Sequence, residues 1–438
     1  MHHYQTTPIY TYTVGIMKIV RRTAMLGLIL SWCPLFLDAA PPPGFYLHDG
    51  DRVVFYGDSI TDQRLYTTFI ETYVVTRFPH LKVSFVHSGV GGDRVSGGGA
   101  GPIEVRLPRD VVAYKPAVMT IMLGMNDASY RAFDQKIFDT YAAGYRHIVQ
   151  SVKEALPGIR ITLIQPSPYD DVTRPPTFEG GYNKVLVRYG EFIKELGRDQ
   201  KLAVADLNGP VVAALERANK LDAENAKKLV PDRVHPAPGG HLLMAEALLK
   251  TWQAPAIVTS VQIDAAEPAI TSVTNTQVTD LAVSERLSWT QMDEALPMPV
   301  DTKDEVMALA LRSSDFLEAM DQEPLRVTGL KAARYTLKID GDTVGAFTKE
   351  EWAKGVNLAT LPTPMAKQAA TVHDLTLRHN VVHFARWRTA GVNLDTLALP
   401  ATHLQAAADA LDALETDIVL QQQAAAQPKS HRYELVAE

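Results

Sequence analysis

The stretch Val53-Val54-Phe55-Tyr56-Gly57-Asp58-Ser59-Ile60-Thr61-Asp62 decides the fold of this protein. Its first four residues are β-branched or aromatic, which indicates a strand buried on both faces. A helical pattern follows at 65–78, and Gly57 with the polar residues after it marks the turn between the two. A buried strand that leads directly into a helix is the opening unit of a parallel sheet with helical connections.

The same alternation continues to about residue 253. Further strands are predicted at 82–87, 117–123, 159–164 and 202–207, and helices at 133–156, 182–198, 211–228 and 240–252. Strands that alternate with amphipathic helices favour an α/β fold, a parallel sheet covered by helices on both faces. In such a sheet the site lies at the carboxyl ends of the strands, so motifs that follow strands are expected to meet there.

After Trp252 the pattern changes. Strands are predicted at 257–263, 281–289, 325–328 and 333–339 in an antiparallel arrangement, with a hairpin turn at 340–342, and helices at 304–321, 363–378 and 402–423. We therefore expect four regions: a leader and signal peptide (1–40), an α/β domain (41–253), a β-rich, sandwich-like module (254–345) and a C-terminal helical region (346–438).

Composition and charge restrict the class of protein. The chain has 438 residues, of which 46% are hydrophobic and 21% charged, as expected of a globular protein with about two domains. The formal net charge of −7 and the lack of a Lys/Arg stripe argue against a nucleic-acid partner. Cys33 is the single cysteine, which excludes an intramolecular disulfide and a multi-thiolate metal site.

The N-terminal segment predicts export. A basic stretch at 17–22 precedes an apolar run at 24–37, and Ala39 or Ala40 offers a cleavage site. We expect a secreted or periplasmic protein without stable membrane insertion after signal removal; an uncleaved N-terminal anchor is the alternative. Trp32 before Cys33 argues against a lipoprotein. If the signal is removed, no cysteine remains, which excludes a thiol nucleophile.

Two glycine-containing motifs follow the first two strands. Ser59 lies where a strand turns into a helix, which presents its hydroxyl and backbone N–H at the sheet edge; as an alternative, Ser59 or Asp62 caps the helix. The stretch 88–94 contains Gly92, which can turn an N–H toward a ligand. Its alternative is a mobile turn, and it lacks the ribose-binding acid of a dinucleotide site.

Two further motifs complete the set. Asn126 ends the strand at 117–123, where its amide can donate to an oxyanion without titrating; an Asx turn is the alternative. His235 lies three residues after Asp232, a spacing that lets the carboxylate hold one ring nitrogen while the other faces a hydroxyl. Each motif alone is weak, but all four should meet at one sheet edge.

This ordered set resembles the SGNH hydrolases, the GDSL esterase and lipase family, over about 51–252. The resemblance implies a three-layer α/β/α, flavodoxin-like core and a carboxylic ester hydrolase. It assigns Ser59 as nucleophile, His235 and Asp232 as the other triad members, and Gly92 and Asn126 as oxyanion donors beside the Ser59 N–H. The sequence departs from the family pattern at two positions, Ile60 in place of leucine and His87 in place of asparagine.

A metal site is the competing interpretation of the same residues. Several acidic side chains near the motifs could converge with His235 on a hard cation: Asp58, Asp62, Asp93 and Asp127. No ligand motif is recognisable, however, so we expect neither a metal nor another cofactor.

Substrate preference is expected to come from the loop at 166–181. Its aromatic and polar side chains suit a sugar or another polar alcohol, unless they only pack locally, and we predict Asp58, Tyr169 and Arg174 as substrate-binding residues. The expected activity is removal of acetyl groups from a small-molecule or carbohydrate ester. A lipase, lysophospholipase or broad arylesterase is an alternative, and so is an inactive carbohydrate-binding protein. Three C-terminal tryptophans could form a sugar platform, although such residues are more often core: Trp289, Trp352 and Trp387.

Overall fold

The computed structural model describes residues 44–394 and 400–438, which belong to one compact unit. The predicted leader, signal peptide and Cys33 lie outside the described residues.

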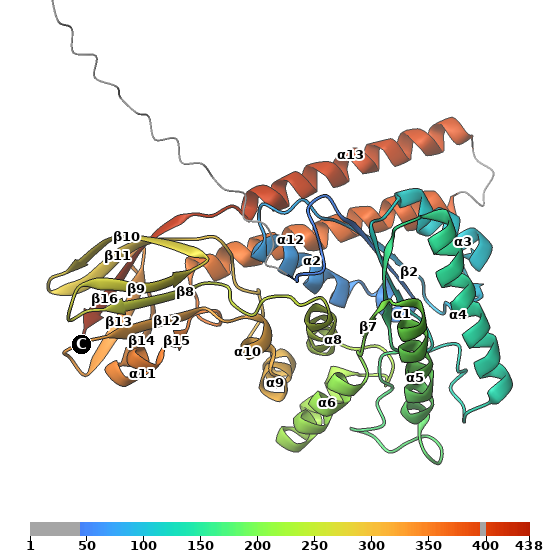
Figure 1. Cartoon of the computed structure of the whole chain (residues 1–438), viewed down its shortest axis with the longest axis horizontal. Coiled ribbons are helices and arrows are strands. Elements are labelled where there is room, and N and C mark those ends of the chain that lie inside the picture. The colour runs from blue at the N-terminus through green and yellow to red at the C-terminus, as the bar shows by residue number, and fades with distance from the viewer. Residues whose placement is uncertain (1–43, 395–399) are drawn as a thin grey trace, which may run out of the picture. The chain divides into compact units, whose positions relative to one another are not determined.

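The α/β part (residues 44–253) is built on a five-stranded parallel sheet in the order β2-β1-β5-β6-β7. Figure 1 labels the two edge strands, β2 and β7, and helices of the same part. The strands are β1 (Arg52–Gly57), β2 (Ser84–Gly89), β5 (Val118–Met122), β6 (Arg160–Ile164) and β7 (Ala203–Ala205). All four neighbouring pairs are parallel, as predicted. The α/β expectation is therefore confirmed.

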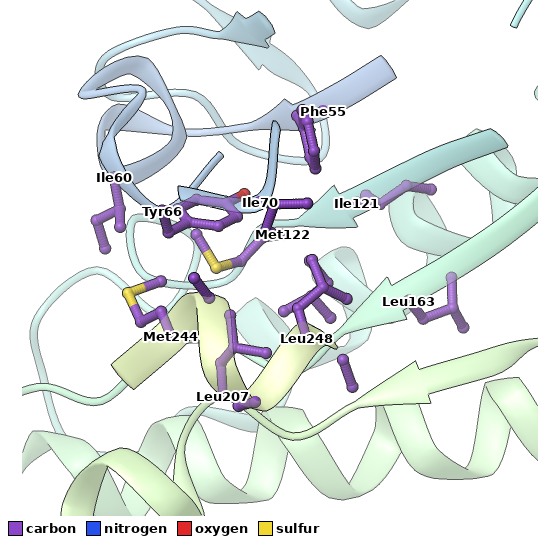
Figure 2. Packing of buried hydrophobic residues seen from close by; sticks show 14 of the residues in the cluster. Phe55, Ile60, Tyr66, Ile70, Ile121, Met122, Leu163, Leu207, Met244 and Leu248 are labelled. Carbon is purple, nitrogen blue, oxygen red and sulfur yellow. The ribbon is translucent and has the colours of Figure 1, made fainter. Parts of the chain in front are cut away.

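Helices connect these strands, among them α2 (Leu65–Arg77), α3 (Ile103–Asp110), α4 (Gln135–Ala155) and α5 (Tyr182–Gln200), and α8 (Pro238–Thr251) follows the last strand. Helices α2 and α8 are buried over most of their length and pack against each other. Figure 2 shows Met244 and Leu248 of α8 in the apolar cluster that also holds labelled residues of the strands. This packing fixes the N-terminal end of α8, which begins three residues after His235.

One predicted helix is in fact two. The segment 211–228 forms α6 (Gly209–Leu221) and α7 (Ala223–Leu229), because Asp222 between them has an extended backbone and its carboxylate caps α7 through the Asn225 N–H. The predicted helix 304–321 is likewise broken at Ser314 into α9 (Glu305–Ser313) and α10 (Phe316–Met320). The Asp222 carboxylate at the first break, and the Ser314 hydroxyl, which accepts the Phe316 N–H at 3.3 Å, at the second, offer the backbone an alternative to a continuous helix.

The C-terminal part contains two further sheets, in the orders β10-β11-β16-β13-β14 and β15-β12-β8-β9. Their strands are β8 (Ser260–Asp264), β9 (Ala269–Thr274), β10 (Thr276–Val283), β11 (Arg286–Asp293), β12 (Pro324–Thr328), β13 (Arg334–Ile339), β14 (Asp342–Thr348), β15 (Val356–Asn357) and β16 (Ser430–Ala437). The turn between β13 and β14 is as predicted, with Asp340 and Gly341 at φ 53° and 89°.

Three details of this part differ from expectation. The predicted strand 281–289 includes the turn between β10 and β11, which pair as a hairpin. Strands β8 and β12 pair in parallel rather than antiparallel fashion. Strand β16, in the stretch predicted to be helical, lies between β11 and β13. Its partners are distant in sequence, so no local pattern indicates them.

Two long helices, α12 (Pro364–Phe384) and α13 (Ala401–Ala425), pack along each other, and α12 also packs on α2. A buried ionic group joins them: Nδ1 of His379 is 2.8 Å from Oε1 of Glu71 on α2, and its Nε2 is 2.9 Å from Oε1 of Glu415 on α13. Burial alone would lower the pKa of His379, but the two carboxylates raise it to about 10. The cationic ring therefore ties both C-terminal helices to α2 of the α/β part.

This group predicts loss of stability at alkaline pH. Because the folded pKa of His379 lies above its unfolded value of about 6.5, its contribution is full below that pH and is lost as pH rises toward about 10. His87 also contacts Glu71, but burial lowers its pKa to about 4. Its ring therefore stays neutral and adds nothing to the loss of stability at alkaline pH. We expect the melting temperature to fall between about pH 7 and pH 10, and to fall less in His379→Gln. Equal slopes in the two proteins would contradict this assignment.

The ends of β1 and β2 touch the short helix α1 (Ser59–Asp62) through glycines. A Cβ on Gly89 would lie 2.3 Å from the Asp62 nitrogen, and one on Gly57 would lie 2.8 Å from the Met122 carbonyl oxygen. Both neighbours are backbone atoms, which cannot move aside without shifting a strand or α1. The strand ends therefore reach the serine turn at a distance that only glycine permits.

We predict that Gly89→Ala destabilises the protein by about 1–3 kcal/mol and lowers esterase activity, because the added methyl group displaces α1. Gly99→Ala is the matched control, since a Cβ there meets no atom within 4 Å. Chemical denaturation and turnover of a small ester would check both effects. Wild-type stability in Gly89→Ala would show that the contact is not tight.

Candidate active site

Ser59 is the first residue of α1 and follows β1 after Asp58. The helix is capped by Asp58, whose Oδ1 accepts a 3.1 Å hydrogen bond from the Ile60 N–H. The capping role considered for Ser59 or Asp62 thus belongs to Asp58. The Ser59 hydroxyl, only partly buried, is free to face another partner.

That partner is His235. Its Nε2 lies 2.8 Å from the Ser59 Oγ, and its Nδ1 lies 2.6 Å from Oδ2 of Asp232. The other oxygen of Asp232 accepts the backbone N–H groups of Val234 and His235 at 2.9 Å and 2.7 Å. The left-handed backbone of Arg233, at φ 74°, turns the chain so that one carboxylate can make all three contacts.

These contacts fix the charge and tautomer of the pair. Partial burial alone would raise the pKa of Asp232, but the His235 N–H, the His235 ring and the Val234 N–H hold it below its usual value. Asp232 is therefore ionised and accepts a hydrogen bond from the Nδ1–H of His235. Nε2 is then left as an acceptor for the Ser59 hydroxyl.

Gly92 lies in the loop after β2, and Asn126 lies in the loop after β5. Gly92 has φ 77°, and a Cβ there would meet no atom within 4 Å. The space beside this residue is therefore open, and its N–H can face a ligand. The preceding Gly91 N–H donates to Oδ2 of Asp62 at 3.1 Å. Nδ2 of Asn126 donates to the Asp93 carbonyl at 3.1 Å, which leaves its second proton for an incoming oxygen.

Tyr130 was not singled out from the sequence, yet it contacts Asn126. Its hydroxyl donates to the Asn126 Oδ1 at 3.0 Å and thereby fixes which way the amide points. Its ring stacks on Tyr182 with centroids 5.0 Å apart and meets Tyr169 at 6.3 Å. No spacing rule indicates such a residue, because the contact depends on the left-handed turn at 129–130.

Asp58 and Asp127 are two of the buried acids near the motifs. Burial raises the pKa of Asp58 to about 7 and that of Asp127 to about 6. Oδ1 of Asp127 accepts the Val95 N–H at 2.9 Å. In the part of the chain that the structure describes, no group of three or more His, Cys, Asp or Glu side chains is arranged to hold a metal ion.

The predicted substrate-binding residues lie in different environments. Asp58 is 1% exposed and acts as the helix cap, whereas Tyr169 is half-buried beside Tyr130. Arg174 donates to Asp170 at 2.8 Å and to the carbonyls of Val230, Lys227 and Pro231 at 2.9–3.1 Å. Its guanidinium therefore holds the loop at 166–181 against the chain that leads to Asp232, and its role in binding stays a prediction.

His87, one of the two departures from the family pattern, lies away from the oxyanion loop. Its Nδ1 is 2.7 Å from the Thr67 hydroxyl and its Nε2 is 3.2 Å from Glu71. It is part of the buried contact with α12 rather than a support for Gly92.

Comparison with known proteins agrees with this geometry. Residues 55–243 match the GDSL-like Lipase/Acylhydrolase family. An acetylxylan esterase of Geobacillus stearothermophilus is 26% identical over 223 residues, which cover 46% of this chain and 93% of that protein. A solved structure, BT4096, a gut microbial diltiazem-metabolizing enzyme, has a TM-score of 0.77 at 25% identity and covers 89% of this chain and 98% of its own.

The protein is thus an α/β hydrolytic enzyme with a C-terminal β-rich and helical region that the structure of BT4096 matches as well. Its residues 55–243 match the GDSL-like lipase/acylhydrolase family, and the protein is a carboxylic ester hydrolase. Among the described residues no helix is both long and apolar enough to cross a membrane.

We predict that Tyr130→Phe lowers kcat about three- to tenfold and changes KM little, because loss of one neutral hydrogen bond frees the Asn126 amide. Tyr189→Phe is the control, since that ring is buried in the apolar core and has no role in the predicted site. Steady-state kinetics with a small ester measure both. If the two variants lose kcat equally, the Tyr130 hydroxyl does not act through Asn126.

Proposed function

We propose that the protein is a serine esterase that removes small acyl groups, acetyl in particular, from carbohydrate or another polar alcohol. The observation that carries this proposal is the chain of short contacts from Ser59 through His235 to Asp232, at 2.8 Å and 2.6 Å. The acetylxylan esterase relative, matched over nearly its whole length, supports the acyl group and the substrate class.

The proposed reaction follows from the tautomer of His235, in which Nδ1 carries the proton and Nε2 can accept one. His235 takes the Ser59 proton at Nε2 while Oγ attacks the ester carbonyl, and Asp232 stabilises the imidazolium that forms. The carbonyl oxygen becomes an oxyanion held by the N–H groups of Ser59 and Gly92 and by the Asn126 amide. His235 then protonates the leaving alcohol, and water attacks the acyl-enzyme by the same route in reverse.

A broad arylesterase is the second candidate. Tyr130, 44% exposed and stacked on Tyr182, offers an aromatic surface next to Asn126, and the similar BT4096 enzyme metabolises diltiazem. Such a surface suits an aromatic leaving group as well as a sugar ring. The two candidates share the catalytic step and differ only in the alcohol.

Replacement of the nucleophile tests the shared step. We predict that Ser59→Ala loses on the order of 10⁴-fold or more in kcat with an unchanged melting temperature, because the hydroxyl is required for attack but not for packing. Ser151→Ala on α4 is the control for the substitution itself. Normal turnover of p-nitrophenyl acetate by Ser59→Ala would refute the proposal, and an inactive wild-type protein would favour a carbohydrate-binding role.

Acetate release then distinguishes the candidates. We expect wild-type protein to deacetylate acetylated xylan or simple sugar acetates faster than phenyl acetate, and acetyl esters faster than long-chain esters. The opposite order for phenyl acetate would favour the arylesterase, and activity that rises with acyl length would favour a lipase. We also propose export, and the N-terminal residue of the mature protein, isolated from its native source, tests it.

A further inference from the structure

The C-terminal region contacts the loop that carries Gly92. A π-helix, η2 (Ala385–Asn393), continues α12 and places two apolar side chains, Trp387 and Val392, in a small buried cluster with Val90 and Ala100. Val90 and Ala100 belong to the stretch 90–100, which contains Gly92. A segment almost 300 residues away in sequence therefore packs against the base of this loop.

A line of hydrogen bonds continues from that contact toward the oxyanion site. Nε1 of Trp387 donates to Oδ1 of Asp110 at 2.8 Å, and the other oxygen of Asp110 accepts from Nη1 of Arg106. Nε and Nη2 of Arg106 donate to Oδ2 of Asp93 at 2.9 Å and 2.6 Å. Asp93 follows Gly92 directly, and its carbonyl accepts the Asn126 amide at 3.1 Å.

The residues that make these contacts are buried, so each depends on its hydrogen-bond partners. Asp93, Arg106 and Asp110 are each 0% exposed, and Trp387 is 2% exposed. Buried charges require their hydrogen-bond partners, so a missing donor at one end shifts the groups that remain. Asp110 also accepts from Arg109, at 2.7 Å and 2.8 Å, so loss of the indole N–H alters its position without removing its neutralising partners.

We propose that Trp387 is a positioning residue for the oxyanion hole. It acts on Gly92 and Asn126 through Asp110, Arg106 and Asp93 and does not itself touch substrate. This inference rests on the proposed function, since it requires Gly92 and Asn126 to be the oxyanion donors. It makes the C-terminal region a part of the esterase machinery rather than an appended module.

Trp387→Phe tests the proposal, because it keeps an aromatic ring in the cluster and removes the indole donor. We expect kcat to fall about tenfold with KM within about twofold, less than the 10²–10³-fold expected for loss of a whole oxyanion donor in Asn126→Ala. The inhibition constant of phenylboronic acid, whose serine adduct is tetrahedral, should rise by about the same factor as kcat falls.

Trp289→Phe is the matched control. Trp289 is also buried in the C-terminal region, and its Nε1 donates to Oε1 of Gln291 at 2.9 Å, but it packs in a separate apolar cluster. It should lose stability to a similar extent and keep its kcat and boronate affinity. Equal losses of kcat in the two variants would overturn the proposal, since a general loosening of the fold would then explain both.

The outcomes separate this inference from the proposed function. An active Ser59→Ala would refute the triad assignment, whereas an inactive Ser59→Ala with a wild-type kcat in Trp387→Phe would overturn the role of Trp387 alone. If Trp387→Phe does not fold, Val392→Ala replaces it as a milder change in the same cluster. A lower kcat at unchanged KM then supports the proposal, and a wild-type kcat with a lower melting temperature overturns it.

Discussion

The hydrogen bond between the Ser59 hydroxyl and Nε2 of His235, at 2.8 Å, is the contact on which the rest of the site depends. It joins two residues that are 176 positions apart, so every element between them contributes to its length. Strand β1 and its terminal glycine place the serine, and the packing of α8 on α2 places the histidine. A hydrogen bond tolerates an error of only a few tenths of an ångström. This narrow tolerance explains why the end of β1 approaches its neighbours at a distance that only glycine permits, and why α2 and α8 are buried where they pack.

The proposed oxyanion donors are held differently. Asp232 and His235 share one turn, whereas Gly92 and Asn126 follow separate strands, β2 and β5, and the Asp93 carbonyl, next to Gly92, accepts the Asn126 amide. Their relative position therefore depends on what holds Asp93. That is a buried guanidinium, Arg106, which carries the positive charge needed to keep a carboxylate inside the protein. The bonds that neutralise the Asp93 carboxylate therefore also set the positions of Gly92 and Asn126.

The sequence predicts the parts of this molecule that are encoded locally. The strand–turn–helix at Ser59 and the Asp232–His235 spacing are readable because each is completed within ten residues. The place of β16 between two earlier strands, the contact of Tyr130 with Asn126 and the bond from Trp387 to Asp110 are not, because each needs partners that only the folded chain brings together. The break at Asp222 lies between these cases: its capping carboxylate is a local signal that the apolar periodicity of 211–228 conceals.

The tryptophans of the C-terminal region restrict how a carbohydrate could be recognised. Trp289, Trp352 and Trp387 are at most 2% exposed, so they are core residues and offer no ring face to a sugar. An exposed aromatic surface is present near the site, where Tyr130 keeps 44% of its surface exposed while its hydroxyl is bonded to Asn126. A group bound on that ring would lie beside Asn126, the proposed oxyanion donor, so substrate binding would be coupled to the geometry of the Asn126 amide. Under the proposed mechanism, selectivity is expected in kcat as well as in KM, because a leaving group that moves the Tyr130 ring also moves the Asn126 amide.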